Sequence, residues 1–244
     1  MVEALGILFL CFVVCFLLGS IPWGVIISRL FFKKDIRSEG SGNIGTTNAM
    51  RTLGKKGGAA VFLLDFGKGL FAGFVATLFA GWLVAINPST GMSIATPLLF
   101  AIGYSPSMSV FDASYLSLQL ALAVGFLGCV SGHIYSPWLK FKGGKGIAVA
   151  VGALFFVFGV WGTLAEILIF AILVIATRYV SVGSLGAALL CPCIALFLYW
   201  GNWVAFVCIA LAAILVIFAH RANIERLYHH CENRIGAKKE PQEG

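Results

Sequence analysis

Seven long apolar runs constrain the fold of this chain more than any other feature of its sequence. Each run holds about 14 to 28 mostly apolar residues, and a helix needs about 20 to cross the hydrocarbon core of a bilayer. Long continuous runs are typical of membrane-spanning helices, whereas the strands of a membrane β-barrel are short and alternate. We therefore predict an all-α polytopic membrane protein with seven transmembrane helices, at about residues 4–30, 59–86, 116–135, 147–160, 161–177, 184–200 and 203–219.

The basic residues decide between six and seven spans. Residues 149–176 are almost continuously apolar, and only Gly159-Val160-Trp161-Gly162 indicates a tight turn, so this run reads as one helix or as two. With seven spans and the N-terminus outside, all 17 Lys and Arg residues fall in cytoplasmic segments or at nearby helix ends. Because cytoplasmic loops of membrane proteins are enriched in Lys and Arg, we predict seven spans with the N-terminus outside and the C-terminus in the cytoplasm.

The composition excludes a soluble domain. The chain is 60% hydrophobic and 11% charged, whereas a soluble domain carries about 25% charged residues. The net charge of +7 indicates contact with anionic lipid headgroups. Nucleic acid is not expected as a partner, because the basic residues are scattered among short loops between helices.

A single integral membrane domain is expected to span residues 1–235. Within it we predict an external loop at 87–114, and after it a polar, disordered tail at 236–244. The first apolar run lacks the basic segment that precedes a cleaved signal peptide, so it is expected to remain as a helix. The seven cysteines show neither metal-binding nor redox spacing and are expected to be small buried apolar residues. The sequence leaves the oligomeric state open.

Three polar segments interrupt the apolar chain, and the predicted topology places them on one face of the membrane. They are residues 39–51, 132–146 and 220–232. The first combines glycines, hydroxyl and amide side chains with Arg51, which is the composition of a loop that wraps an oxyanion. In the second, residues 142–146 (Lys-Gly-Gly-Lys-Gly) precede a predicted helix N-terminus at Ile147 and indicate a local anion site. A basic loop that only follows the topology would explain the same residues.

Ionisable residues inside the predicted spans are further candidates, because such residues are costly in a membrane. Asp65 and Lys68, three positions apart, either take part in function or satisfy each other as an ion pair with Lys68 reaching toward the membrane surface. His133 is either a functional residue or a hydrogen-bonded residue at a helix end. Glu166 has no obvious partner, and it either faces a cavity or is a protonated structural residue.

Together, the three segments resemble the motifs of the bacterial membrane acyl-phosphate:glycerol-3-phosphate acyltransferases. The first motif of that family, G-S-G-N-x-G-A-T-N-x-x-R, matches residues 40–51. The second, G-H followed by F-K-G-G-K-G, matches residues 132–133 and 141–146, and the third, H-R-x-N-I-x-R-L-x-x-G-x-E, matches residues 220–232. Two positions depart from the pattern, because Thr46 replaces an alanine and His230 replaces a glycine at a turn.

The resemblance implies a multi-pass enzyme of the bacterial inner membrane with its active site facing the cytoplasm. Its reaction would transfer a fatty acyl group from acyl phosphate to the sn-1 hydroxyl of glycerol 3-phosphate, as the first step of phospholipid synthesis. The products would be 1-acyl-glycerol 3-phosphate (lysophosphatidic acid) and phosphate, and no metal or cofactor would be needed. A transporter for a phosphorylated metabolite is the alternative class, but it would need polar residues through the bilayer midplane, and here they cluster at one face.

The same resemblance assigns expected roles to individual residues. Those expected to hold the acyl phosphate are Ser41, Gly42, Asn43, Gly45, Thr47, Asn48 and, from a short turn at 178–184, Ser181. Those expected to hold glycerol 3-phosphate are Arg51, Lys142, Gly143, Gly144, Lys145, Gly146, His220 and Asn223. The catalytic candidates are Ser41, Arg51, His220 and Asn223, with Asp65, Lys68 and His133 as additional site candidates. The resemblance implies that a substrate phosphate accepts the hydroxyl proton, and a general base at His220 is the competing hypothesis.

Overall fold

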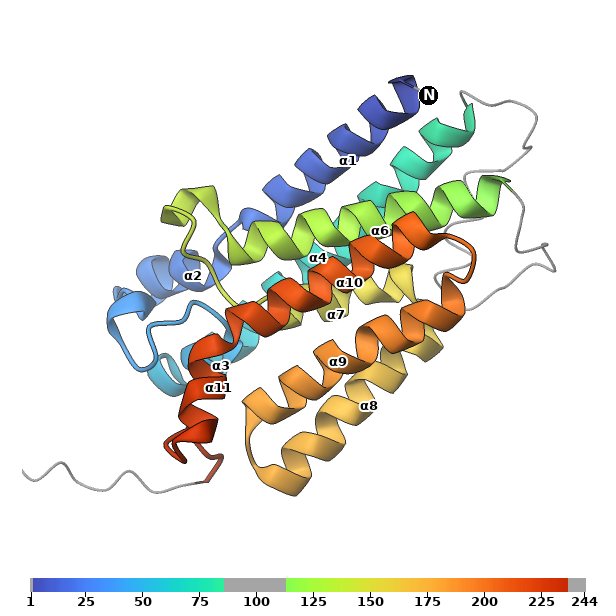
Figure 1. Cartoon of the computed structure of the whole chain (residues 1–244). Coiled ribbons are helices and arrows are strands. Elements are labelled where there is room, and N and C mark those ends of the chain that lie inside the picture. Colours follow the sequence, from blue (N-terminus) through green and yellow to red (C-terminus); the bar gives the residue numbers. More distant parts are fainter. Residues whose placement is uncertain (1, 86–112, 237–244) are drawn as a thin grey trace, which may run out of the picture.

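The chain folds into helices joined by short connections (Figure 1). The structure, a computed structural model, describes residues 2–85 and 113–236. The predicted external loop and tail therefore lie almost entirely outside the described residues. The helices are α1 (Val2–Ser20), α2 (Trp23–Phe32), η1 (Ile36–Ser38), α3 (Thr46–Thr52), α4 (Gly54–Ala85), α6 (Ala113–Ile134), η3 (Pro137–Leu139), α7 (Ile147–Val157), α8 (Gly159–Thr177), α9 (Val180–Leu198), α10 (Trp203–Ala219) and α11 (Arg221–Tyr228).

The prediction of an all-α membrane protein is confirmed, because the described residues form several long apolar helices. Among the described residues, five helical segments are long and apolar enough to cross a bilayer, or six if α10 and α11, which meet at a bend of 52°, count as one span. Helix α7 is apolar but shorter. The count of seven spans and the orientation of the termini stay predictions.

The apolar run at 149–176 consists of two helices. Phe158 separates α7 from α8, and Gly159 next to it has a φ of 67°, a left-handed conformation that ends helices readily when the residue is glycine. The chain reverses direction there (Figure 1). The hydroxyl of the buried Tyr199 donates to the carbonyl of Val157 at 2.7 Å, which satisfies a backbone group that the break leaves free.

The first apolar run is broken, which the sequence analysis did not predict. Helix α1 ends at Ser20 and α2 begins at Trp23, because Pro22 has no N–H and its ring excludes a continuous helix. Side chains from distant parts of the chain satisfy the carbonyls that this break exposes. The Lys68 ammonium donates to the Ile21 carbonyl at 2.7 Å, and the Ser136 hydroxyl donates to the Ser20 carbonyl at 2.6 Å.

Close packing joins α1, α4, α6, α7 and α10 into one bundle. Their shared core is made of small and medium apolar residues, and the helix axes approach closely where glycine faces a neighbouring backbone. At Gly69, for example, an added Cβ would overlap the Val149 carbonyl of α7.

Helices α8 and α9 form a hairpin that packs on the bundle through α7 and α10. The hairpin is tied to α6 far from the polar loops, where the Gln119 side chain donates to the Leu198 carbonyl at 2.7 Å. Beside it, Asn202 at the start of α10 donates to the Leu116 carbonyl of α6 at 2.9 Å. At its other end, the Ile235 N–H donates to the Arg178 carbonyl at 2.8 Å. The α8–α9 turn, α3 and α11 all lie at the end of the bundle opposite the N-terminus (Figure 1). The connection from α6 through η3 to α7, which holds the second polar segment, lies at the same end, so the three predicted polar segments are brought to one end of the molecule (Figure 1).

Candidate functional site

Asn48 determines the shape of the first polar segment. Its side chain is buried, and its Oδ1 accepts a hydrogen bond from the Ser41 N–H at 2.8 Å. Its Nδ2 donates to the carbonyls of Ile36, Glu39 and Asn43 at 3.2, 3.1 and 2.9 Å. These bonds use both N–H donors of the amide and one of the two acceptor positions of its oxygen, so Asn48 holds the loop in shape. Its contact with acyl phosphate stays a prediction.

Only the first half of this segment is a loop. Helix α3 begins at Thr46, so Thr47 and Arg51, which are four residues apart, lie on one face of a short helix. Thr46, which the sequence analysis did not place in the site, lines the cavity described below. Its Oγ1 is buried and has no hydrogen-bond partner among the described residues. The alanine-to-threonine departure therefore adds a hydroxyl without a protein partner to the cavity wall.

The second polar segment contributes less than predicted. The N–H groups of Gly143 and Gly144 donate to the carbonyls of Ile134 and His133, at 2.9 and 3.0 Å, and so are not available to an anion. Both glycines allow close packing instead, since an added Cβ at Gly144 would overlap the His133 ring. The prediction that these two residues bind substrate through their N–H groups is wrong.

The remaining residues of this segment do not all line the cavity, although they are close in sequence. Lys142 is exposed and does not line the cavity, whereas Lys145 and Gly146 do. Helix α7 starts immediately afterwards, and its first N–H groups have no partner within the helix. The structure therefore retains the predicted anion site only at Lys145, Gly146 and the beginning of α7.

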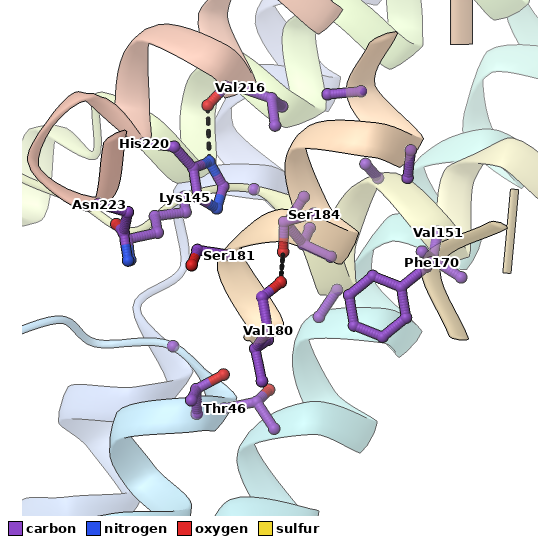
Figure 2. Close-up of a pocket in the computed structure, with 18 of the residues that line it drawn as sticks. Thr46, Lys145, Val151, Phe170, Val180, Ser181, Ser184, Val216, His220 and Asn223 are labelled. Carbon is purple, nitrogen blue, oxygen red and sulfur yellow. Dashed lines mark hydrogen bonds between the residues drawn. The ribbon is translucent and has the colours of Figure 1, made fainter. Parts of the chain in front are cut away.

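The third polar segment starts where α10 meets α11. His220 is 2% exposed, and its Nδ1 lies 2.8 Å from the Val216 carbonyl, so Nδ1 carries the proton and Nε2 is an acceptor (Figure 2). The Asn223 side chain donates to Glu232 at 3.0 Å, and Arg226 donates to the other Glu232 oxygen at 2.8 Å. Glu232 thus pairs within this segment and fixes the amide of Asn223.

The turn at His230 is preserved without glycine. His230 adopts a φ of 56°, the left-handed region that the family glycine would enter without strain. The N–H groups of His230 and Cys231 donate to the carbonyls of Leu227 and Arg226 at 3.2 and 2.9 Å. The turn that leads to Glu232 therefore forms with histidine at this position.

A cavity of about 350 Å³ brings the three segments together. Its polar part contains His220, Asn223, Lys145 and Ser181, with Thr46 across from them (Figure 2). The other predicted residues that line it are Ser41, Asn43, Gly45, Thr47, Asn48, Arg51, Asp65, His133 and Gly146. Ser181 lies in the first turn of α9 rather than in a longer turn at 178–184, and its hydroxyl is buried without a hydrogen-bond partner among the described residues.

An apolar part extends the same cavity between α7, α8, α9 and α10, and the sequence analysis missed it. Val151 and Phe170 lie along it, away from the polar group (Figure 2). The available signal was a stripe of small residues on one face of α9, spaced three or four apart. Its members are Ser181, Ser184, Ala188 and Cys191.

Positive charge dominates the polar part. Lys145, Arg51 and Arg226 line it, against Glu232 and Asp65. The pKa of Lys145 is lowered from 10.5 to about 8, mainly by burial; Glu232 opposes this shift, and nearby Arg226 and Arg51 contribute to it. An anion bound beside Lys145 would restore the charged form. The cavity therefore offers a cationic chamber joined to an apolar channel.

Asp65, Lys68 and His133 form a buried cluster beside this chamber. The Lys68 ammonium lies 2.8 Å from Asp65 Oδ1, 3.0 Å from His133 Nδ1 and 2.7 Å from the Ile21 carbonyl. The predicted ion pair exists, but Lys68 turns into the bundle instead of reaching toward the surface. Asp65 and His133 line the cavity, whereas Lys68 does not, so Lys68 holds the other two in position.

Comparisons with known proteins identify the family to which this chain belongs. The family model described as Glycerol-3-phosphate acyltransferase matches residues 9–230. Proteins named Glycerol-3-phosphate acyltransferase from Bradyrhizobium diazoefficiens and Staphylococcus carnosus are each 36% identical to this chain over 93% of it, and over 94% and 96% of their own lengths. Crystal structures of PlsY (YgiH), an integral membrane glycerol 3-phosphate acyltransferase, match over 96% of both chains. The glycerol 3-phosphate form gives a TM-score of 0.69 at 31% identity, and the lysophosphatidic acid form gives 0.67 at 30%. This chain therefore belongs to the glycerol-3-phosphate acyltransferase family and is a multi-pass membrane acyltransferase.

Proposed function

We propose that this protein transfers a fatty acyl group from acyl phosphate to the sn-1 hydroxyl of glycerol 3-phosphate. The observation that carries the proposal is the single cavity in which a cationic chamber continues into an apolar channel. A doubly charged acceptor fits the chamber, and the chain of a lipid-soluble donor fits the channel. The names of the relatives and the glycerol 3-phosphate form of PlsY support the acceptor.

The donor head group is assigned to hydroxyls and a helix terminus. Ser41, Thr47 and Ser181 line the chamber, and the Thr46 hydroxyl joins them. The beginning of α7 adds N–H groups and the positive end of a helix dipole, both of which favour phosphate.

The acceptor is assigned to the basic side of the chamber. Arg51 and Lys145 supply charge for its phosphate, and Asn223 and His220 supply hydrogen-bonding atoms. The arginine can pair with two phosphate oxygens at once, which fixes orientation as well as charge.

The chemistry needs positioning more than a strong base, because acyl phosphate is an activated mixed anhydride. The acceptor hydroxyl oxygen bonds to the acyl carbon, the bond from that carbon to the phosphate oxygen breaks, and inorganic phosphate leaves. The hydroxyl proton passes to a substrate phosphate oxygen. Lys145, the hydroxyls and the α7 terminus stabilise the negative charge that develops.

Changing His220 to glutamine tests the proton acceptor. If a substrate phosphate takes the proton, His220→Gln should retain kcat within about tenfold, because the amide can still accept a hydrogen bond at the cavity wall. The measurement is steady-state phosphate release at saturating substrates, with the KM for glycerol 3-phosphate reported separately. A loss of about 10²- to 10⁴-fold in kcat would assign the base to His220 instead.

The charge on Lys145 predicts a pH dependence. Below a pH of about 8 the ammonium is charged in the substrate-free enzyme and can pair with the acceptor phosphate, and above that pH it becomes neutral. We expect kcat/KM for glycerol 3-phosphate to fall by about tenfold or more as the pH rises through this value. In Lys145→Arg, which keeps its charge, the inflection should be absent. The same inflection in that variant would assign the titration to another group.

The proposed topology has seven spans in a single domain of residues 1–235, with the N-terminus outside and the chamber facing the cytoplasm of a bacterial inner membrane. Its support is the gathering of the basic loops at one end of the bundle (Figure 1). In this orientation glycerol 3-phosphate comes from the cytoplasm and the acyl donor from the bilayer.

Phosphate release by the purified protein in lipid tests the function. The assay uses palmitoyl phosphate and glycerol 3-phosphate, omits each in turn, and replaces the donor with palmitoyl-CoA as a control. Release that requires both substrates and does not occur with the CoA ester supports transfer from acyl phosphate. No release from a folded sample, together with uptake of glycerol 3-phosphate into proteoliposomes, would support a transporter.

A further inference from the structure

Glu166 lies at the far end of the apolar part of the cavity. Its residue is 2% exposed, it lines the cavity from α8, and its Oε1 is buried with no hydrogen-bond partner among the described residues. A buried hydrogen-bond acceptor without a partner costs free energy of folding. Such an oxygen is unusual, above all in a cavity wall that is otherwise apolar. Glu166 takes no part in the chemistry described above.

The depth of Glu166 follows from helix geometry. On α7, α8, α9 and α10, the lining residues farthest from the polar chamber are Leu154, Glu166, Cys191 and Ala213, which we call the cavity floor. Ser181 lies at the chamber, and Cys191 follows it by ten residues on the same helix, which corresponds to about 15 Å along the axis. Glu166 is similarly placed on α8, eleven residues before the end of that helix at Thr177. The channel thus offers space for the first part of an extended acyl chain and then meets the floor.

The floor favours chains that stop before Glu166. Methylene groups gain free energy against Leu154, Ala213 and the channel walls. A methyl end that reaches the carboxyl offers it no hydrogen bond and prevents any other donor from reaching it. A longer chain must therefore displace the Glu166 side chain or bend out of the channel.

We propose that Glu166 sets the upper limit of acyl-chain length in the donor. This inference rests on the proposed function, since it requires an acyl donor in the channel. It makes Glu166 a specificity-determining residue that contacts the end of the chain and leaves the reacting atoms untouched.

The test is a chain-length profile of kcat/KM measured with saturated acyl phosphates from medium to long chains, in the wild type and in Glu166→Ala. The alanine variant removes both the bulk and the unpartnered oxygen, and should fold because no described hydrogen bond is lost. We expect donors just beyond the wild-type optimum to gain about fourfold for each further methylene that the enlarged channel accepts. Shorter donors and the KM for glycerol 3-phosphate should be unchanged.

Two control variants separate the floor from general effects. Glu166→Gln keeps the size and polarity of the side chain and should keep the wild-type profile. Leu168 lies on the same helix as Glu166, is 60% exposed and does not line the cavity. Leu168→Ala should therefore also keep the wild-type chain-length profile. An active Glu166→Ala enzyme with an unshifted profile, or an equal shift in Leu168→Ala, overturns the inference. Wild-type protein that releases no phosphate with a donor of any length overturns the proposed function and the inference together.

Discussion

Replacing Arg51 by alanine should raise the KM for glycerol 3-phosphate by about 10- to 100-fold, because a hydrogen bond to a charged group is worth about 1.5–3 kcal/mol. Arg51 lies on the face of α3 that lines the cavity, one helical turn beyond Thr47. Its guanidinium can hold two phosphate oxygens in a fixed plane. The measurement is the initial rate of phosphate release against acceptor concentration, at a saturating acyl phosphate.

Arg51→Lys and Lys55→Ala are the matched variants for this prediction. The lysine keeps the charge but loses the planar pair of donors, so its KM should lie between those of the wild type and Arg51→Ala. Lys55 is an exposed cation near the start of α4 that does not line the cavity, and its removal should leave the KM unchanged. An equal increase of the KM for glycerol 3-phosphate in Arg51→Ala and Lys55→Ala would mean that Arg51 acts only by general attraction of anions.

Replacing Asn48 by alanine should abolish most activity while the bundle stays folded. The change leaves the Ser41 N–H and the carbonyls of Ile36, Glu39 and Asn43 without their side-chain partner. Each such loss in a buried place costs about 1–3 kcal/mol, which is enough to let the loop leave its bound shape. We expect kcat/KM to fall by more than about 100-fold, with faster amide hydrogen exchange confined to residues 36–48.

Asn48→Asp provides the graded control. A carboxylate still accepts from Ser41 but cannot donate to the three carbonyls, so the variant should also lose activity and loosen the loop. If either variant loses activity while the amide hydrogens of residues 36–48 exchange at the wild-type rate, Asn48 contacts substrate directly. Wild-type activity in Asn48→Ala would contradict the positioning role.

The sequence predicted the helices better than the breaks within them. Apolar runs fixed the existence and approximate limits of α4, α6, α9 and α10, since a span is a property of many residues. Pro22 interrupts the first apolar run, and the carbonyls that the interruption exposes are paired with Lys68 and Ser136, which come from distant parts of the chain. Such compensation depends on tertiary contacts that no local pattern contains.

For the site, the residue types indicated the chemistry but not which atoms are free. The motif of 141–146 suggested an anion loop throughout, yet two of its glycine N–H groups bond to the end of α6. Asn48 looked like a ligand because it is a polar residue in a polar loop, and the structure places its amide against the backbone of that loop. The apolar channel was missed because it lies between four helices, and each contributes only a few small or ordinary residues.

The contacts of Lys68 also bear on how the chain assembles in a membrane. Lys68 reaches the Ile21 carbonyl from one earlier helix break and His133 from a later helix, so its bonds can be complete only when α1, α4 and α6 have come together. Until α4 is in place, the Ile21 carbonyl has only the Trp23 N–H, at 3.1 Å, as a donor, and an incompletely paired backbone group is costly in hydrocarbon. Arrival of α4 supplies the Lys68 ammonium to this carbonyl, and arrival of α6 then brings His133 to Lys68 and to the site. Assembly of α1, α4 and α6 therefore also sets Asp65 and His133 in place at one wall of the chamber.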